Sequence, residues 1–285
     1  MSYNHLTGSI PSEFGSIRNL KELTLSVNFL KGTIPSTIGD LGQLRTLELD
    51  FNLISGSMPT TLGNLMLLKR LNLWDNQLVG KIPTNIGTMF DLEEIKFHNN
   101  KVTGTIPTEI GALFTTLKVF DATGNHLHGT IPTELGLILP LESLDLGNSG
   151  LEGPIPTELA KCTNLSTMGL SNNLMNGTIP TQFGALTKLQ FLFLSSNKLI
   201  GTLPSELGQL TLLGVLQLQT NRLEGVVPTD LGKLGALKTL NLSDNYSLKS
   251  QISESICGLR TAGALTTFIA SCDTCKVPSC CTQCA

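Results

Sequence analysis

The sequence predicts an α/β solenoid, a right-handed superhelix with a parallel β-sheet on its concave face and short helical turns and polar loops on its convex face. Two observations predict this fold. One eight-residue phrase recurs along the chain, as KGTIPSTI from residue 31, TGTIPTEI from 103 and HGTIPTEL from 128. The copies follow a period of about 24 residues, and the pattern L-x-x-L-x-L runs before them. A fixed period of this length is the sequence signature of stacked repeats.

Asparagine marks the period. It recurs in steps of 24 residues, with one step of 25, and Ser149 stands in the place of one missing copy. A side-chain amide both donates and accepts hydrogen bonds, so a buried column of amides can satisfy the backbone turns of neighbouring coils. Asn4 begins the series, and the predicted structural ladder is Asn28, Asn52, Asn76, Asn100, Asn125, Asn173, Asn197, Asn221 and Asn245.

The leucines before each asparagine predict a short strand. In LKELTL, for example, Leu23 and Leu25 alternate with polar residues and therefore share one face of a strand. One such strand cannot bury its apolar face alone. Stacking about eleven repeats would join the strands into a parallel sheet over a continuous leucine core.

Glycine and proline predict how the chain leaves each strand. A glycine stands four residues after each marker asparagine, where it permits a positive φ, and a proline stands seven residues after it, where it fixes φ. Serine or threonine follows every one of these prolines, from Ser12 to Thr229, often with an acid next. Since hydroxyl residues cap helices and acids suit a first turn, we expect a short helical turn with the hydroxyl residue as its N-cap.

These residues resemble the leucine-rich repeat, in the 24-residue L-x-G-x-I-P form of plant extracellular proteins. The chain is similar over about residues 4 to 270 to ectodomains of plant receptor-like kinases and receptor-like proteins, and to polygalacturonase-inhibiting proteins. The resemblance implies an extracellular or cell-surface protein of signal transduction or defence. Relatives carry a cysteine-bearing cap before the first repeat. This chain begins inside a truncated repeat without that cap, and the given sequence has no signal-peptide pattern.

We expect two parts, a solenoid over residues 1–256 and a degenerate last repeat with a cysteine-rich cap over residues 257–285. The cap cysteines are Cys257, Cys272, Cys275, Cys280, Cys281 and Cys284. We favour a disulfide cap, whose six cysteines allow fifteen pairings. A zinc site at the two C-x-x-C pairs is the alternative, although the adjacent Cys280 and Cys281 suit one tetrahedron poorly. Cys162 replaces a leucine and is expected to be a buried thiol.

Function must lie in the residues that vary around each strand and point away from the core. Trp74 is the only tryptophan, and it is flanked one repeat away by Asp50 and His98. An exposed aromatic ring among carboxylates and amides suits a sugar ring or a peptide anchor, whereas local packing is the alternative role. The predicted ligand-binding residues on the concave face are Glu48, Asp50, Phe51, Asn72, Trp74, Asp75, Lys96, His98, Asp121, Phe191 and Phe193.

Several classes of function are not expected. A net charge of −3 gives no basic surface for nucleic acid, and no apolar run reaches the length of a membrane span. No histidine stands with an evident nucleophile, and phosphate-binding and dinucleotide-binding fingerprints are missing. We therefore expect no catalytic residue, metal or cofactor, and no enzyme activity. The expected partner is an extracellular protein, peptide or oligosaccharide.

A surface-organising or ice-binding solenoid is the alternative function. A hydroxyl residue often follows the repeat glycine, and such a column on a stiff solenoid can order water; its members are Ser9, Thr33, Ser57, Thr105, Thr130, Thr178 and Thr202. Lys81, Pro154 and Val226 interrupt it. Glycosylation sequons at Asn164, Asn176, Asn241 and Asn245 agree with an exported glycoprotein, although Asn245 belongs to the predicted ladder.

Overall fold

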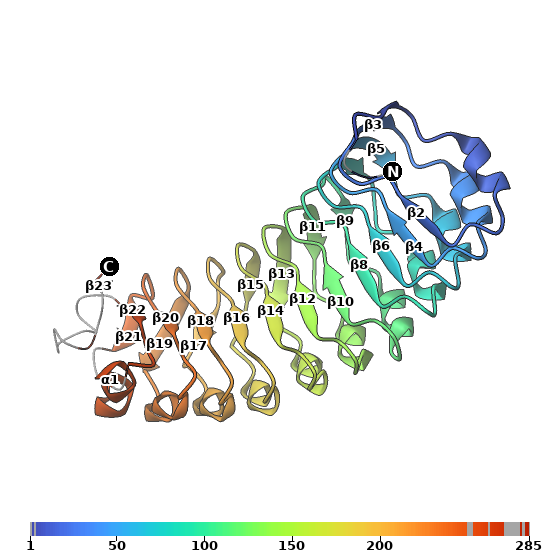
Figure 1. The fold of residues 1–285 in the computed structure, drawn as a ribbon. Coiled ribbons are helices and arrows are strands. Elements are labelled where there is room, and N and C mark those ends of the chain that lie inside the picture. Colours follow the sequence, from blue (N-terminus) through green and yellow to red (C-terminus); the bar gives the residue numbers. More distant parts are fainter. Residues whose placement is uncertain are drawn as a thin grey trace. The chain divides into compact units, whose positions relative to one another are not determined.

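A computed structural model describes residues 2, 4–249, 253–261, 263–270, 280 and 283–284 of the chain. It divides into two compact units, Met1–Gly150 and Leu151–Ala285. The same coil is repeated within each unit (Figure 1). The predicted fold class is confirmed, because each coil contributes a short strand to a parallel sheet and a 3₁₀ turn on another side. The boundary predicted after residue 256 stays a prediction.

The first unit presents a parallel sheet whose strands lie side by side in Figure 1. These strands are β2 (Glu22–Thr24), β4 (Thr46–Glu48), β6 (Arg70–Asn72), β8 (Glu94–Lys96), β10 (Val119–Asp121) and β12 (Ser143–Asp145). A second set of strands follows the turn after each of them. This set is β1 (Thr7–Gly8), β3 (Phe29–Gly32), β5 (Leu53–Ser57), β7 (Gln77–Val79), β9 (Thr103–Gly104) and β11 (His126–Gly129).

The core of the first unit consists of the apolar residues that alternate along these strands. The central residues of β4, β6, β8 and β10 are Leu47, Leu71, Ile95 and Phe120, and each is 0% exposed. Burying a large apolar side chain stabilises a fold by about 1.5–3 kcal/mol, so repetition of this position in every coil is the main stabilising term. Because the inward positions are fixed in this way, the outward positions are free to differ.

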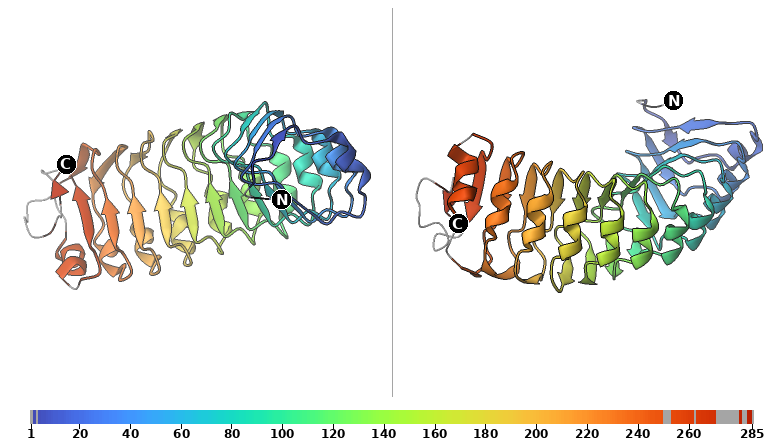
Figure 2. Two further views of the ribbon diagram at one scale, coloured as in Figure 1. Left: turned by 45° about the horizontal axis from the view of Figure 1, so that its top comes forward. Right: turned by 90° about the horizontal axis from the view of Figure 1, so that it is seen from below.

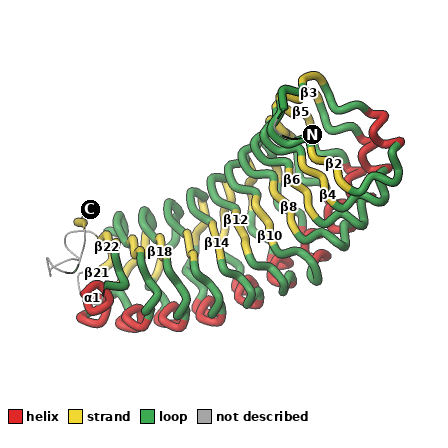
Figure 3. Tube along the Cα trace, in the orientation of Figure 1, coloured by secondary structure: helices red, strands yellow, loops and turns green. Residues whose placement is uncertain are grey.

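Each coil of the first unit closes through a 3₁₀ turn, drawn as a helix in Figure 3. The turns are η1 (Ser12–Ser16), η2 (Ser36–Asp40), η3 (Thr60–Asn64), η4 (Thr84–Thr88), η5 (Thr108–Leu113) and η6 (Thr133–Leu137). The expectation of a helical turn after each proline is confirmed, but the expected N-cap is wrong. Pro107, for example, holds the extended cap position and its carbonyl accepts from the Ile110 amide at 3.2 Å. Thr108 is already the first residue of the turn, because proline's fixed φ suits the position before it.

The marker asparagines join one coil to the next. Asn52 Oδ1 accepts from the Leu30 amide of the preceding coil at 3.0 Å. Its Nδ2 donates to the Leu25 and Leu49 carbonyls, both at 3.0 Å. The same bonds recur at Asn76 and Asn100. Each amide therefore satisfies backbone groups of two coils, and a buried backbone group without a partner would be costly.

The second unit repeats this construction (Figure 2). Its sheet strands are β14 (Thr167–Gly169), β16 (Phe191–Phe193), β18 (Val215–Gln217), β20 (Thr239–Asn241), β22 (Thr267–Ala270) and β23 (Gln283–Cys284). The second strands are β13 (Gly150–Pro154), β15 (Leu174–Asn176), β17 (Ile200–Gly201), β19 (Arg222–Val226) and β21 (Ser247–Lys249). The helical elements are η7 (Thr157–Lys161), η8 (Thr181–Ala185), η9 (Ser205–Gln209), η10 (Thr229–Lys233) and the α-helix α1 (Glu254–Thr261).

The cysteines of the second unit occupy two kinds of position. Cys162 is fully buried, as expected, and burial raises the pKa of its thiol to about 11. Cys257, on α1, forms a disulfide with Cys280, as the disulfide reading of the tail predicts. The predicted cap residues Cys272, Cys275 and Cys281, and the side chain of Cys284, lie outside the described residues.

Candidate binding face of the first unit

We call the outward side chains of β2 to β12, with those that directly follow these strands, the strand face. Cross-strand pairing places its residues in straight rows. One row is Thr24, Glu48, Asn72, Lys96, Asp121 and Asp145, each paired with its neighbour in the next strand. Neighbouring strands lie about 4.8 Å apart, so side chains along a row can touch. Of the predicted binding residues, Glu48, Asn72, Lys96 and Asp121 thus lie in a single row.

An aromatic row runs beside this polar row. The ring centroids of Phe51 and Trp74 are 4.2 Å apart in an edge contact, and those of Trp74 and His98 are 4.7 Å apart in a stacked contact. Phe51 is 45% exposed, and Trp74 is half-buried by its two neighbours. Trp74 therefore faces outward, as its place in the repeat predicts, and its ring is held in one orientation by the rings on either side.

Asp50 differs from its expected place on the exposed face. Its side chain is buried, and Ser26 Oγ donates to Asp50 Oδ1 at 2.7 Å. The following residue, Phe51, takes the contact with Trp74 that the sequence assigned to Asp50. The sequence could not reveal this exchange, because it depends on the hydrogen bond that Ser26 of the preceding coil donates to Asp50.

His98 and Asp121 form a coupled pair at one end of the aromatic row. His98 Nδ1 lies 2.9 Å from Asp121 Oδ2, and the Thr123 amide donates to Asp121 Oδ1 at 3.0 Å. Burial raises the pKa of Asp121, but the contacts with His98 and the Thr123 amide outweigh it and the net pKa is lowered. Asp121 is therefore an ionised carboxylate that orients the His98 ring against Trp74.

Two other carboxyls on the face resist ionisation. Burial first, and then the nearby Asp121, raise the pKa of Asp145, although Ser143 Oγ donates to its carboxylate at 2.8 Å. Burial and Asp50 likewise raise the pKa of Glu48, and Arg70, with Nε 3.9 Å away, offsets only part of this. Carboxylates gathered here repel one another, so a cation at this surface would relieve them.

The two cations of the strand face already have acidic partners. Arg70 lies near Glu48, and Lys96 Nζ lies 2.7 Å from Glu94 on the same strand. Asn72, between them in the polar row, has its Oδ1 atom buried without a hydrogen-bond partner among the described residues. The face therefore combines paired cations, further carboxylates and an amide acceptor that is not satisfied within the described chain.

Phe191 and Phe193, the remaining predicted binding residues, project from β16 in the second unit. Their ring centroids are 6.2 Å apart and nearly parallel, and Phe191 is 38% exposed. Val215 and Gln217 pair with them across the sheet. These rings form an apolar spot within the second unit.

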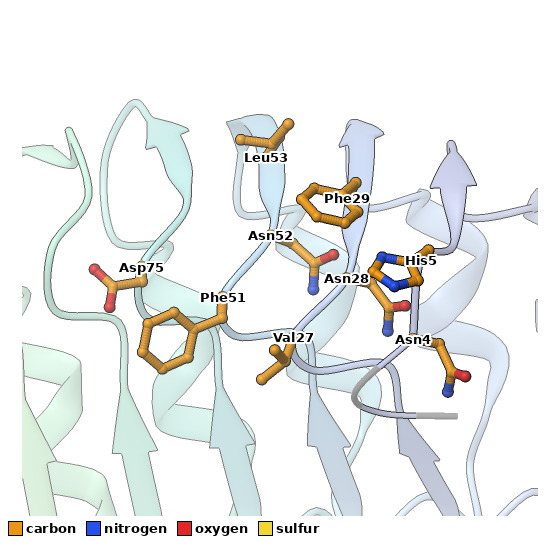
Figure 4. Close-up of a pocket in the computed structure, with 9 residues that line it drawn as sticks. All are labelled: Asn4, His5, Val27, Asn28, Phe29, Phe51, Asn52, Leu53 and Asp75. Carbon is orange, nitrogen blue, oxygen red and sulfur yellow. The ribbon is translucent and has the colours of Figure 1, made fainter.

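An apolar pocket lies beside the aromatic row and was not expected from the sequence (Figure 4). The pocket has a volume of about 490 Å³, and Phe51 and Asp75 are the only predicted binding residues that line it; the others are Asn4, His5, Val27, Asn28, Phe29, Asn52 and Leu53. The residue directly before each ladder asparagine could have indicated this pocket. That position is Asn or Asp in several repeats but Val27 and Phe51 in the first repeats.

Two further kinds of feature, a metal-binding cluster and a membrane-spanning helix, were sought among the described residues. There, the side chains of His, Cys, Asp and Glu form no group of three or more that could hold a metal ion. The helices described in the structure include none with the length and apolar character required to cross a membrane.

These features define the protein as a repeat solenoid with a variable outward face. Residues 18–78 and 140–199 match the family model described as leucine rich repeat. A plant peptide hormone receptor, RGFR1 in complex with RGF2, is 33% identical over 95% of this chain, with a TM-score of 0.83. The Arabidopsis receptor kinase HAESA ectodomain, in complex with an IDA peptide hormone, is 34% identical over 95% of the chain, with a TM-score of 0.76. The chain is a leucine-rich repeat protein similar to plant receptor kinase ectodomains.

The chain matches about half of the length of each of these receptors. The chain spans 46% of the RGFR1 chain and 49% of the HAESA chain. A plant ice-binding protein is 28% identical over 80% of this chain, which spans 73% of that protein, with a TM-score of 0.70. No curated protein sequence gives a significant match.

Proposed function

We propose that this protein is a non-catalytic extracellular recognition module that binds a peptide on the strand face of the first unit. The aromatic row of Phe51, Trp74 and His98 beside the carboxylates carries the proposal. Large aromatic rings held rigidly among polar groups are the residues that most often dominate binding free energy. Two similar receptors, RGFR1 and HAESA, have peptides bound in their structures, which supports a peptide over an oligosaccharide.

The geometry suits a peptide in an extended conformation. The rows of the strand face run across β2 to β12, so they offer successive side chains at a spacing of about 4.8 Å. An extended peptide rises about 3.3 Å per residue, so its alternate side chains are about 6.6 Å apart and can follow such rows without matching them strand for strand. Trp74 would then serve as the central contact.

Selection from a displayed library of random peptides, followed by titration of an enriched peptide, tests this proposal. Trp74→Ala is expected to weaken binding of the enriched peptide by at least about tenfold, the effect of losing a central aromatic contact. The midpoint of thermal unfolding should change little, because Trp74 lies outside the core. Tyr246→Ala removes an exposed aromatic ring of the second unit that has no predicted binding role. It is the matched control and should bind normally. Enrichment of no peptide, or full binding by Trp74→Ala, would refute the proposal.

Ice binding is a second candidate, which the similarity to a plant ice-binding protein favours. In the first unit the hydroxyl residues Ser9, Thr33, Ser57, Thr105 and Thr130 are all exposed. The positive φ of Gly56 and its missing Cβ leave room for the Thr33 methyl group, and Gly129 does the same for Thr105. The exposed Lys81 interrupts the row.

This second candidate has a direct test. It predicts thermal hysteresis and shaped ice crystals at micromolar protein, and it predicts that Thr105→Lys abolishes both. Trp74→Ala should leave both unchanged, since Trp74 belongs to the strand face. Ordinary ice growth in the presence of the wild-type protein would remove ice binding as a function.

A further inference from the structure

We propose that the pocket beside the aromatic row receives an apolar side chain of the peptide ligand, and that basic residues of the same peptide lie next to that side chain. The inference rests on the proposed peptide binding and adds the chemistry of the partner. Three features support it: the lining of the pocket, the backbone conformation that builds it, and the charge of the surface that it adjoins.

The pocket gathers exposed apolar side chains from consecutive repeats. Phe29 is 52% exposed, Leu53 46% and Phe51 45%. His5 stacks on Phe29 with ring centroids 5.8 Å apart, and the two rings lie together at one side of the pocket in Figure 4. The volume of about 490 Å³ lies in the range of ligand pockets. Apolar residues scattered singly are ordinary, but several around one cavity indicate a place where a partner is bound.

Unfavourable backbone conformations build this pocket. Val27 has a φ of 55° and Phe51 a φ of 51°, in the left-handed region that β-branched and bulky side chains avoid. Asp75, Asn99 and Asn148 take the same conformation at the same place in later repeats. Asparagine and aspartate tolerate it, whereas other residues lose about 1–2 kcal/mol there. Ser196 and Thr220 adopt it in the second unit as well, so this φ belongs to the repeat. Val27 and Phe51 differ from the other residues at this position because they place apolar side chains at the pocket despite the local cost.

The charge of the surface next to the pocket indicates which residues of the peptide lie beside its apolar side chain. Phe51 both lines the pocket and packs against Trp74, so a ligand anchored in the pocket continues onto the strand face. Asp75 stands at the rim of the pocket, and Glu48, Asp121 and Asp145 lie in the polar row. The lysines beside the strands, Lys69 and Lys118, pair with Glu93, and Arg70 and Lys96 lie near Glu48 and Glu94. Among the described residues, no lysine or arginine pairs with Asp75, Asp121 or Asp145, so these carboxylates favour a lysine or arginine from the ligand.

Peptides enriched from the displayed random library test this inference by their sequences. The expected sequences combine an aromatic or large aliphatic residue with lysine or arginine nearby. A synthetic copy is then titrated while the emission of Trp74, the only tryptophan of the chain, is recorded. Replacing the apolar residue of the peptide by serine should weaken binding at least about tenfold. Replacing its basic residues by alanine should weaken binding and abolish its salt dependence.

Variants of the protein test separately the preference for the apolar residue and the preference for the basic residues of the peptide. Phe29→Ser with Leu53→Ser should remove the preference for the apolar residue and keep that for basic residues. Leu174→Ser is the matched control, since Leu174 holds the same repeat position in the second unit and is 44% exposed, and it should bind like wild type. Asp121→Asn with Asp145→Asn should remove the preference for basic residues.

The outcomes distinguish the inference from the proposed function. Enriched peptides that depend on Trp74 but are neutral or acidic, or lack an apolar residue, would overturn the inference and leave peptide binding intact. Unchanged binding by the Phe29→Ser and Leu53→Ser double variant would overturn it as well. A library that yields no enriched peptide would refute the proposed function and this inference together.

Discussion

The two units use the same scaffold and present different surfaces. Among the described strands of the first unit, outward side chains include the charged residues Glu48, Lys96, Asp121 and Asp145. In the second unit, the outward side chains of β14, β16, β18 and β20 carry no charge; they are Thr167, Phe191, Phe193, Val215, Gln217, Thr239 and Asn241. The buried positions of the two units scarcely differ, since leucine, isoleucine, methionine and phenylalanine fill both cores.

The difference shows which positions of a repeat are constrained. An inward side chain must fit the coils on both sides, and close packing leaves few alternatives. An outward side chain meets water or a partner and can change at little cost to the fold. The scaffold alone does not require the charged and aromatic surface of the first unit, which agrees with the proposed role in binding.

Loss of a ladder asparagine should harm both units strongly and to a similar degree. Asn52→Ala leaves the Leu30 amide without its acceptor, and Asn221→Ala does the same to the Leu199 amide. Each change also removes the hydrogen bonds that Nδ2 donates to backbone carbonyls. With about 1–3 kcal/mol for a buried group left without a partner, we expect each variant to lose about 2–4 kcal/mol of unfolding free energy. Urea denaturation measures this, with the exposed Asn64→Ala and Asn176→Ala as near-neutral controls. A large loss in only one unit would show that the two scaffolds are not equivalent.

Restoring the missing rung of the ladder should stabilise the first unit. Ser149 stands where the repeat calls for asparagine, and its Oγ is buried without a partner among the described residues. Elsewhere the asparagine oxygen accepts from the amide 22 residues earlier, which here is that of Leu127. We expect Ser149→Asn to gain about 1 kcal/mol, seen as a higher melting temperature. Ser149→Ala is the control, and equal gains from both variants would contradict a restored ladder.

Relief of the backbone at the pocket should also stabilise the first unit, by about 1 kcal/mol. Val27→Asn places at φ 55° a residue that accepts this conformation, as Asn148 already does at φ 52°. The reverse change, Asn148→Val, should destabilise by a comparable amount. Thermal unfolding of both variants checks the pair. A loss of stability in Val27→Asn would mean that packing of the valine outweighs its backbone conformation.

The smallest expected effect concerns the pH dependence of stability at Asp145. Burial and Asp121 raise the pKa of Asp145 in the folded state, so its ionisation opposes folding. Its favourable contribution is present below the unfolded pKa and is lost as pH rises through the folded pKa. Asp145→Asn should therefore raise the melting temperature at pH 7 and give no gain near pH 3, where wild-type Asp145 is protonated. An equal gain at both pH values would point to packing instead of charge.

The sequence predicted the scaffold in detail, because its signals are local and repeated. Alternating leucines, marker asparagines and prolines correctly located the strands, the inter-coil hydrogen bonds and the turns. It misjudged the hydroxyl residue after the proline, which is the first residue of a 3₁₀ turn and not its cap. That detail depends on how tightly the turn is wound, which the residue types alone leave open.

The candidate site was only partly predictable. Position in the repeat placed Trp74, His98 and Asp121 on the outward side, and the structure brings these side chains together. Asp50 obeys the same pattern and yet is buried, because Ser26 of the preceding coil holds it. The pocket around Phe29, Phe51 and Leu53 was missed, since its residues come from separate coils at different positions of the repeat.

By itself the sequence therefore determined the repeat, the core and the set of residues that face outward, since hydrophobic periodicity specifies which side of a strand is buried. Which outward residues touch depends on how the coils pack against one another. The stacking of rings along the aromatic row and the raised and lowered pKa values of the carboxyls arise from contacts between coils. Such contacts depend on lateral register, which no single repeat encodes.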